Sequence, residues 1–352
     1  MLRTGADKLA GREFLPTSAR AVLGYYADTG VFDYRSLRLQ RRVEDTTGEM
    51  VADAFAAVES AIADAFDREF VEFSYDTKLV LPAELTLGYC YRHGTDDGRA
   101  EEVTRLVIEA LVDGDMRDAI NDDEFEDFEV DFAVDAADRR RIAEIAQETL
   151  QGRVESLFAE YPDSVRAAYD WAVDISEAHQ DEDEHFRELM TAATGGDAER
   201  ARERISEEYK FADFDDPPRV FDTRELDLPY LKTQYDRVGV IYDGMIEMYR
   251  EAGLDVEDAF KKSIVLAIIG AQVWLDDVDD YDADMREGQL TPVTAEYLLT
   301  DDQTAAADAV VDISQRYLDL AKDHASVVDS TLTGIAAEYI YRSGNPEVLP
   351  GG

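Results

Sequence analysis

The sequence predicts an all-α protein. Across most of its 352 residues, apolar side chains recur at spacings of three and four, which is typical of helices that bury one face. No segment alternates apolar and polar residues in the pattern of a strand, with a hairpin turn behind it. Clusters of glycine, proline and aspartate separate the periodic segments. We therefore expect a single helical domain over residues 1–352, built as one large bundle.

The expected helices follow one another with short breaks. The periodic segments are residues 49–70, 78–94, 100–116, 139–161, 162–180, 228–253, 256–280, 291–300 and 304–340. The last of these is long enough for two helices, which gives about ten in all. The breaks are residues 93–99, 194–199, 214–222 and 253–255. Residues 121–138 are acidic and irregular, and we expect an inserted loop there.

The charge and the apolar pattern exclude several classes of protein. With a net charge of −45, the chain repels nucleic-acid phosphates and anionic membrane surfaces, so we expect neither as a partner. The longest apolar run, residues 263–275, is shorter than the ~18 residues that a membrane span needs. The N-terminal residues lack the apolar segment of a signal peptide, and the single cysteine, Cys90, excludes an internal disulfide. We expect a cytoplasmic protein with Cys90 buried.

The basic residues indicate a halophilic, archaeal source. Lysine supplies only 7 of the 35 basic residues, against 80 acidic ones. Such a composition suits a salt-rich cytoplasm, because dense salt screens the self-repulsion of the carboxylates.

A tight aspartate cluster ends the helix predicted over 256–280. It consists of Asp276, Asp277, Asp279 and Asp280. In so acidic a chain such clusters arise by chance, and a solvated helix end is the alternative to a metal site. The helix is apolar on almost all sides, however, and carboxylates at its end raise each other's pKa unless a cation neutralises them. A four-residue spacing places Gln272, Asp276 and Asp280 on one helix face, and Mg²⁺ favours carboxylate oxygen.

Several short motifs follow one another between residues 228 and 300. They are Lys232-Thr233, Gly270-Ala271-Gln272, the aspartate cluster, and Glu287-Gly288-Gln289-Leu290-Thr291-Pro292. Their order and spacing resemble the second half of polyprenyl diphosphate synthases such as geranylgeranyl and farnesyl diphosphate synthases, which belong to the class I isoprenoid synthase superfamily. That family carries KT, then GxAFQxxDDxxD, then EGKxTLP. Its glutamine lies three residues before the first aspartate, whereas Gln272 lies four before Asp276, so Asp276 and Asp279 are an alternative matching pair.

The N-terminal half is similar to the same family more loosely. Residues 77–82, TKLVLP, stand where the family has GKRLRP, and residues 111–118, LVDGDMRD, stand where it has LIHDDxxD. Gly114 replaces one aspartate of this first aspartate-rich motif, which is therefore degenerate. His179 and His185 fall near the place of the family's GQxxDL helix, and we expect both to be exposed.

The resemblance implies a role for each matching residue, with Mg²⁺ as the cofactor in a central cavity. The implied magnesium ligands are Asp276 and Asp280, supported by Asp277, on one side, and Asp115 and Asp118, with Asp113 as a substitute for the missing aspartate, on the other. Lys232 would contact the diphosphate, and Thr233 and Gln272 would turn oxygen dipoles towards the developing cation. Lys78 is what remains of the basic site for isopentenyl diphosphate.

The implied activity is that of a prenyltransferase in isoprenoid biosynthesis. An allylic prenyl diphosphate would ionise with the help of Mg²⁺, and the cation would condense with isopentenyl diphosphate inside apolar walls that exclude water. The expected assembly is a homodimer or a heteromer with another prenyl synthase. One alternative is a terpene-cyclase-like enzyme that ionises a single prenyl diphosphate. Another is an inactive homologue that serves as a partner subunit or binds prenyl lipids, and the simplest is a halophilic bundle with no site.

Overall fold

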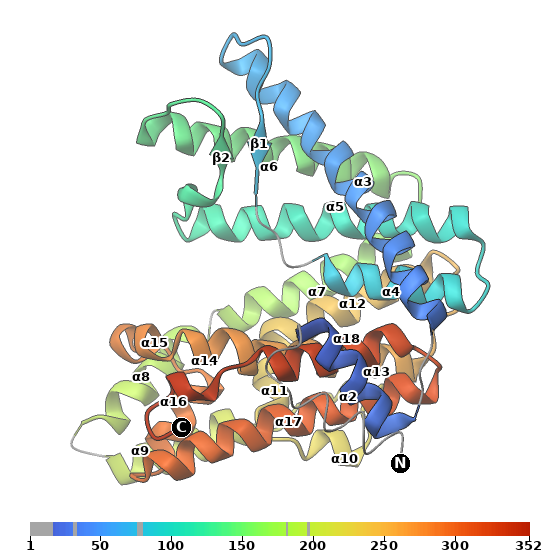
Figure 1. Ribbon diagram of the computed structural model, residues 1–352. Helices are drawn as coiled ribbons and strands as arrows, with labels where there is room; N and C mark the ends of the chain where they lie inside the picture. Colours follow the sequence, from blue (N-terminus) through green and yellow to red (C-terminus); the bar gives the residue numbers. More distant parts are fainter. Residues whose placement is uncertain (1–16, 31–33, 76–79, 181, 196–197) are drawn as a thin grey trace. The chain divides into compact units, whose positions relative to one another are not determined.

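The computed structural model describes residues 17–30, 34–75, 80–180, 182–195 and 198–352. Most of these residues are helical, and the only β-structure among them is one antiparallel pair of two-residue strands, so the predicted all-α class is confirmed (Figure 1). The N-terminal elements are α2 (Thr17–Thr29), α3 (Tyr34–Ala65), β1 (Phe73–Ser74), α4 (Leu81–Arg92), α5 (Asp97–Asn121), η1 (Phe125–Asp127), β2 (Glu129–Val130) and α6 (Ala136–Phe158).

The remaining elements complete the chain. They are α7 (Asp163–Gln180), α8 (Asp183–Ala193), α9 (Ala198–Arg204), η2 (Ile205–Lys210), α10 (Thr223–Leu226), α11 (Leu231–Gln234), η3 (Tyr235–Gly239), α12 (Val240–Glu251), α13 (Asp258–Ala271), η4 (Gln272–Asp276), α14 (Asp277–Asp279), α15 (Tyr281–Glu287), α16 (Pro292–Leu299), α17 (Gln303–Val327), α18 (Thr331–Ser343) and η5 (Pro346–Val348). None of these helices is long and apolar enough to cross a membrane.

Helix ends follow the predicted breaks closely. The Asp96 side chain accepts a hydrogen bond from the Arg99 backbone N–H and so begins α5, just after the break that ends α4. The segment predicted over 304–340 is indeed two helices, α17 and α18. Residues 121–138 contain η1 and β2, and Val130 of β2 pairs with Phe73 of β1.

The chain divides into two compact units. The first contains the described residues of 1–33, 170–244 and 257–352, and the second those of 34–169 and 245–256. The predicted single domain and its central cavity stay predictions.

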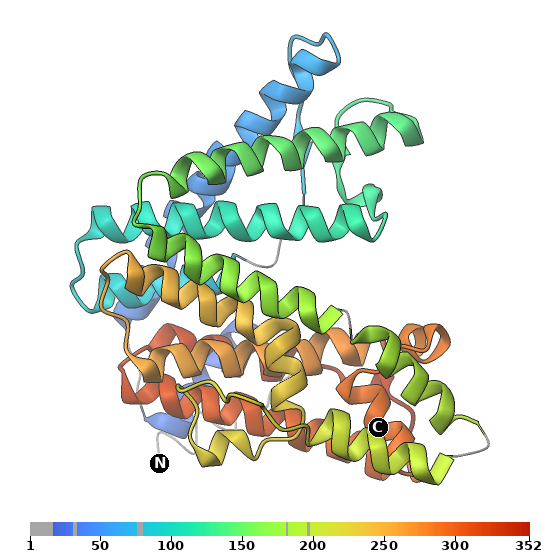
Figure 2. The same ribbon diagram turned by 180° about the vertical axis from the view of Figure 1, so that it is seen from behind.

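The second unit is built around α5. This helix packs along α6, and α3 packs against α4, α5 and α6 (Figure 1, and from behind Figure 2). The faces that meet are lined with Ile, Val, Leu and Ala side chains, as the three- and four-residue spacing requires. Cys90 of α4 is buried, as predicted.

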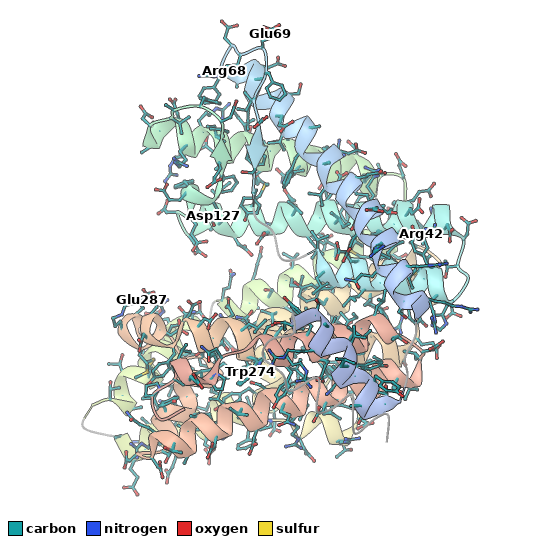
Figure 3. The ribbon with its side chains drawn as sticks, in the orientation of Figure 1. Arg42, Arg68, Glu69, Asp127, Trp274 and Glu287 are labelled. Carbon is teal, nitrogen blue, oxygen red and sulfur yellow. The ribbon has the colours of Figure 1, made fainter. Side chains whose placement is uncertain are left out.

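The first unit is built around α13, which packs against α17 and α18, while α2 packs on α18. Gly270 permits the close approach of α13 and α17, because a Cβ atom there would lie 2.9 Å from Leu318 Cγ. In Figure 3, Trp274 lies inside this group of helices and Glu287 lies at its edge, which agrees with their buried and exposed side chains. The aspartate cluster therefore follows directly on one of the most apolar helices of the unit.

Candidate functional site

The aspartate cluster begins at a π-helical turn. In η4 the Asp277 backbone N–H donates to the Gln272 carbonyl, five residues back, so the turn holds one residue more than an α-helical turn. The Gln272 side-chain Nε2 reaches both the Asp276 carboxylate and, at 3.3 Å, Asp277 Oδ1. The extra residue between Gln272 and Asp276 is thus accommodated within the turn, and Gln272 lies against the first two aspartates.

Asp277 is the buried member of the cluster. Its Oδ1 accepts hydrogen bonds from Gln272 Nε2 and from Arg237 Nη1, the latter at 3.2 Å. Its Oδ2 has no hydrogen-bond partner among the described residues. Burial raises its pKa to about 6, although Arg237 works in the opposite direction. The other three carboxylates of the cluster, those of Asp276, Asp279 and Asp280, are exposed.

The site holds more negative charge than its own cations balance. Burial, and then Asp277, raise the pKa of Asp284 in α15 to about 7, while Arg237 lowers it. Carboxylates that resist ionisation in this way are stabilised when a cation binds beside them. The donor set and the unpartnered Asp277 Oδ2 therefore fit a hard cation such as Mg²⁺.

Protein groups alone do not form a complete metal cage. Within the described ranges, no three His, Cys, Asp or Glu side chains converge closely enough to hold a metal ion. Mg²⁺ is commonly bound by one or two carboxylates together with phosphate oxygens and water. Binding of Mg²⁺ at this site would therefore need further oxygen ligands from water or from a bound molecule.

Lys232 lies at the start of a strained segment. Tyr230, directly before α11, has a positive φ of 64°, which is costly for an aromatic residue. Lys232 Nζ lies 3.2 Å from Asp236 and 3.5 Å from Glu182. Burial opposes its charge, but these two carboxylates outweigh it and raise the pKa of Lys232. Lys232 therefore stays an ammonium group in a half-buried position.

Thr233, the other predicted residue of this segment, has defined partners, and its neighbour Gln234 is partly bonded. The Thr233 hydroxyl is buried and lies 3.3 Å from the carbonyl oxygens of Tyr209 and Tyr230, to which it donates. Gln234 Nε2 contacts the Tyr209 hydroxyl at 3.4 Å, and its Oε1 has no partner among the described residues. A second π-helical turn, η3, follows, in which the Val240 N–H donates to the Tyr235 carbonyl.

His179 is buried, so the prediction that it is exposed is wrong. Only 7% of the residue is exposed, because the end of α7 packs the ring beside Phe186. Its Nδ1 has no hydrogen-bond partner among the described residues and lies 3.9 Å from Glu182 Oε2. Burial, and then Lys232 and Arg237, lower its pKa to about 4, so the ring is neutral at pH 7.

Arg237 is the residue of this site that the sequence did not reveal. It lies in η3, five residues after Lys232, and its guanidinium contacts Asp277, forty residues further along the chain. The only signal is an arginine that follows Asp236 and directly precedes an apolar helical stretch, Val238 to Ile241. Such a signal does not stand out without knowledge of what the helix faces.

The first aspartate-rich motif, in the second unit, is engaged by protein groups. Asp113 is buried, accepts a hydrogen bond from Gln147 Nε2 at 3.1 Å, and has a pKa raised by burial. Asp115 accepts a hydrogen bond from the hydroxyl of Tyr75 and, after burial, raises the pKa of that tyrosine. Asp113 and Asp115, two apart on α5, lie on nearly opposite faces of the helix.

Arg117, inside the same motif, adds a positive charge to it. Burial opposes its charge, but Tyr169, Asp113 and Asp118 outweigh burial and raise the pKa of Arg117. The acids of the first motif are thus partly neutralised by the chain itself. Lys78, the remaining predicted site residue, lies outside the described residues.

Comparison with known proteins supports the fold. The chain is similar to the solved structure of a geranylgeranyl pyrophosphate synthetase from the archaeon Geoglobus acetivorans, with a TM-score of 0.50 and 15% identity. The match covers 87% of this chain and 98% of that one. No protein-family model matches the chain, and no curated protein matches its sequence. The all-α fold is therefore of the isoprenoid synthase type.

Proposed function

We propose that the protein is a Mg²⁺-dependent prenyltransferase that acts on an allylic prenyl diphosphate. The observation that carries this proposal is the π-helical turn η4, which brings Gln272, Asp276 and Asp277 together at a site short of positive charge. The fold type and the order of the motifs agree with it.

The cluster's residues would hold the metal and the diphosphate. Asp276 and Asp280, both exposed, would bind Mg²⁺, and Asp277 Oδ2 would support them. When bound, Mg²⁺ would supply the charge that stabilises the departing diphosphate. Lys232, an ammonium held by Asp236 and Glu182, would donate to a phosphate oxygen.

The reaction would break the C–O bond of the allylic substrate and release diphosphate. The allylic carbon would then bond to the terminal alkene carbon of isopentenyl diphosphate, and loss of a proton would restore a double bond. The Thr233 hydroxyl and the Gln272 amide would orient dipoles near the cation. The buried apolar side chains of α13 would keep water away from it.

A second candidate is an enzyme that ionises a single prenyl diphosphate, as a terpene cyclase does. The observation in its favour is the first motif, where Gln147, Tyr75 and Arg117 already engage the carboxylates that would bind a second set of ions. Such an enzyme would need the cluster of the first unit but no isopentenyl diphosphate.

One set of incubations separates these candidates. The purified protein is incubated with Mg²⁺ and, in separate reactions, labelled dimethylallyl, geranyl, farnesyl or geranylgeranyl diphosphate, each with and without isopentenyl diphosphate. A prenyltransferase elongates the label only when isopentenyl diphosphate is present, and a single-substrate enzyme releases diphosphate in both arms. No release in either arm refutes both and leaves an inactive subunit or lipid binder.

Two variants test the residues. Asp276→Ala with Asp280→Ala should lower turnover on the order of 100- to 1,000-fold, since both carboxylates would hold the metal. Asp279→Ala is the matched control, because it removes one exposed carboxylate of the same cluster and should leave turnover nearly unchanged. If Asp279→Ala lowers turnover by a similar factor as well, the alternative pairing of Asp276 with Asp279 holds.

The assembly and its setting complete the proposal. We expect a cytoplasmic protein from a halophilic archaeon, present as a homodimer or with another prenyl synthase. Light scattering in concentrated KCl, alone and after mixing with an active synthase, measures the assembly.

A further inference from the structure

Arg237 has more hydrogen-bonding capacity than its contacts use. A guanidinium carries five N–H donors. With the described residues, the Arg237 side chain makes one hydrogen bond, from Nη1 to Asp277 Oδ1 at 3.2 Å. The side chain is 27% exposed, so its remaining donors are within reach of a ligand.

Other arginine pairs of the chain whose carboxylate is buried are built differently. Arg153 donates through Nε and Nη2 to both oxygens of Glu109, which is fully buried. Arg342 donates through Nε and Nη2 to Glu338 Oε1, and Lys322 donates to the other oxygen of that carboxylate. In both cases two donors meet the carboxylate and each of its oxygens has a partner.

The Arg237–Asp277 pair is, by contrast, incomplete on both sides. One oxygen of Asp277 has no hydrogen-bond partner among the described residues, and most of the N–H donors of Arg237 make no hydrogen bond with those residues. Burial of two charges costs free energy that only complete hydrogen bonding offsets. A pair that served the fold alone would be expected to use the two-pronged geometry of Arg153 and Arg342.

Incomplete hydrogen bonding occurs at several places in the described residues of the first unit, and part of it lies near Arg237. His179 Nδ1 and Gln234 Oε1 are further buried atoms that lack partners among the described residues, and the charge of Arg237 acts on both His179 and Tyr209, the contact of Gln234. No such atom belongs to the described residues of the second unit. Unsatisfied buried groups mark places where a ligand, ion or water completes the bonding.

We propose that Arg237 is a second cationic binding residue for the substrate's diphosphate. Asp277 holds one edge of the guanidinium, and the free edge donates to phosphate oxygens. Arginine suits this task because its planar fork matches phosphate. Lys232 is already engaged by Asp236 and Glu182, so Arg237 is the cation of this site with the larger share of unused donors. The inference rests on the proposed function, since it assigns a contact within the same site.

Binding of inorganic pyrophosphate tests the inference without turnover. Isothermal titration in concentrated KCl, with and without Mg²⁺, compares the full-length protein with Arg237→Gln and Arg237→Lys. We expect Arg237→Gln to weaken pyrophosphate binding about tenfold or more in both conditions, because charge-assisted hydrogen bonds are lost. Arg237→Lys, which keeps the charge but not the fork, should lose about threefold.

Arg342→Gln is the matched control, because it breaks a buried arginine pair of the same unit. It should lower the melting temperature and leave pyrophosphate affinity within about twofold of wild type. If Arg237→Gln, shown to be folded by circular dichroism, binds pyrophosphate as wild type does, Arg237 serves only the fold. If that variant does not fold, an unchanged affinity in Arg237→Lys overturns the inference equally.

The outcomes also separate this inference from the proposed function. Pyrophosphate binding that depends on Arg237, without release of diphosphate from prenyl substrates, supports the contact and refutes the prenyltransferase. Prenyl transfer that proceeds at the wild-type rate and affinity in Arg237→Gln supports the enzyme and refutes the contact.

Discussion

Asp277 should make the stability of the protein depend on pH in a direction opposite to that of an ordinary ion-paired carboxylate. Its pKa is 3.8 as a reference and about 6 in the folded protein, mainly because of burial. Between these values the folded protein binds a proton that the unfolded chain does not. The contribution of Asp277 to stability therefore increases as the pH falls through 6 and is absent at pH 8.

The magnitude follows from the same two values. At pH 5, about one unit below the folded pKa, the gain is on the order of 1 kcal/mol relative to pH 8. Asp277→Asn cannot titrate, and its loss of the Arg237 ion pair is a constant offset. Both proteins carry Asp284→Asn, because Asp277 raises the pKa of that neighbouring carboxyl and its titration would otherwise differ between them. The free energy of unfolding of the protein that keeps Asp277 minus that of the Asp277→Asn variant should thus rise by on the order of 1 kcal/mol between pH 8 and pH 5.

Guanidinium chloride unfolding at fixed KCl, with EDTA present to exclude metal ions, measures this difference. Asp279→Asn removes an exposed carboxylate of the same cluster and provides the baseline to subtract. A difference that stays constant within about 0.3 kcal/mol from pH 8 to pH 5 would show that Asp277 is solvated, and the buried, charge-deficient site would then have to be abandoned.

Three further predictions concern the scaffold. Gly270→Ala should destabilise the protein by about 1–3 kcal/mol in thermal melts, because the new methyl group would lie 2.9 Å from Leu318 Cγ. Adding Leu318→Ala should relieve part of that clash. An unchanged melting temperature in Gly270→Ala would mean that α17 shifts to accommodate the methyl group without cost. Arg153→Leu should cost about 3–5 kcal/mol in guanidinium unfolding, since Glu109 is fully buried against it, and a cost below about 1 kcal/mol would contradict this. The melting temperature should rise with KCl concentration, since salt screens a net charge of −45; a maximum in dilute buffer would remove the halophilic interpretation.

The sequence predicted most of the long helices, because burial of one face sets their period, but it missed α2, the first part of α3, and α8. It could not predict the π-helical turns, since a period of 3.6 contains no sign of one extra residue. A regular helix places Gln272, Asp276 and Asp280 on one face. In the structure, the widened turn η4 places the Gln272 amide against Asp276 and Asp277 instead. The widened turn η4 therefore determines which aspartate of the cluster is buried.

The few lysines of the described residues share a structural role that does not involve a phosphate. Each lysine of the described residues pairs with a carboxylate, and each side chain is at most 22% exposed. They are Lys210, Lys232, Lys261, Lys262 and Lys322. Lysine is thus retained where an ammonium group completes a partly buried ion pair, and its presence at 232 does not by itself indicate a ligand.

Sequence patterns also could not show which acids are already satisfied. Asp113 and Asp277 each lie in an aspartate-rich motif and each is buried. Asp113 receives a hydrogen bond from the Gln147 amide, a contact that depends on the packing of α6 on α5. Asp277 keeps one oxygen without a partner among the described residues. Only the tertiary structure separates these two cases.

The difference between the two motifs has a consequence for function. A carboxylate that is bonded to protein groups must give up those bonds before it can bind a metal ion, whereas an unpartnered one gains a bond. The free energy available for binding is therefore greatest at the second motif, where the π-helical turn and Arg237 leave groups unsatisfied. If the protein binds a diphosphate, we therefore expect the second motif to bind it more readily than the acids beside Arg117, which would first have to give up their own partners.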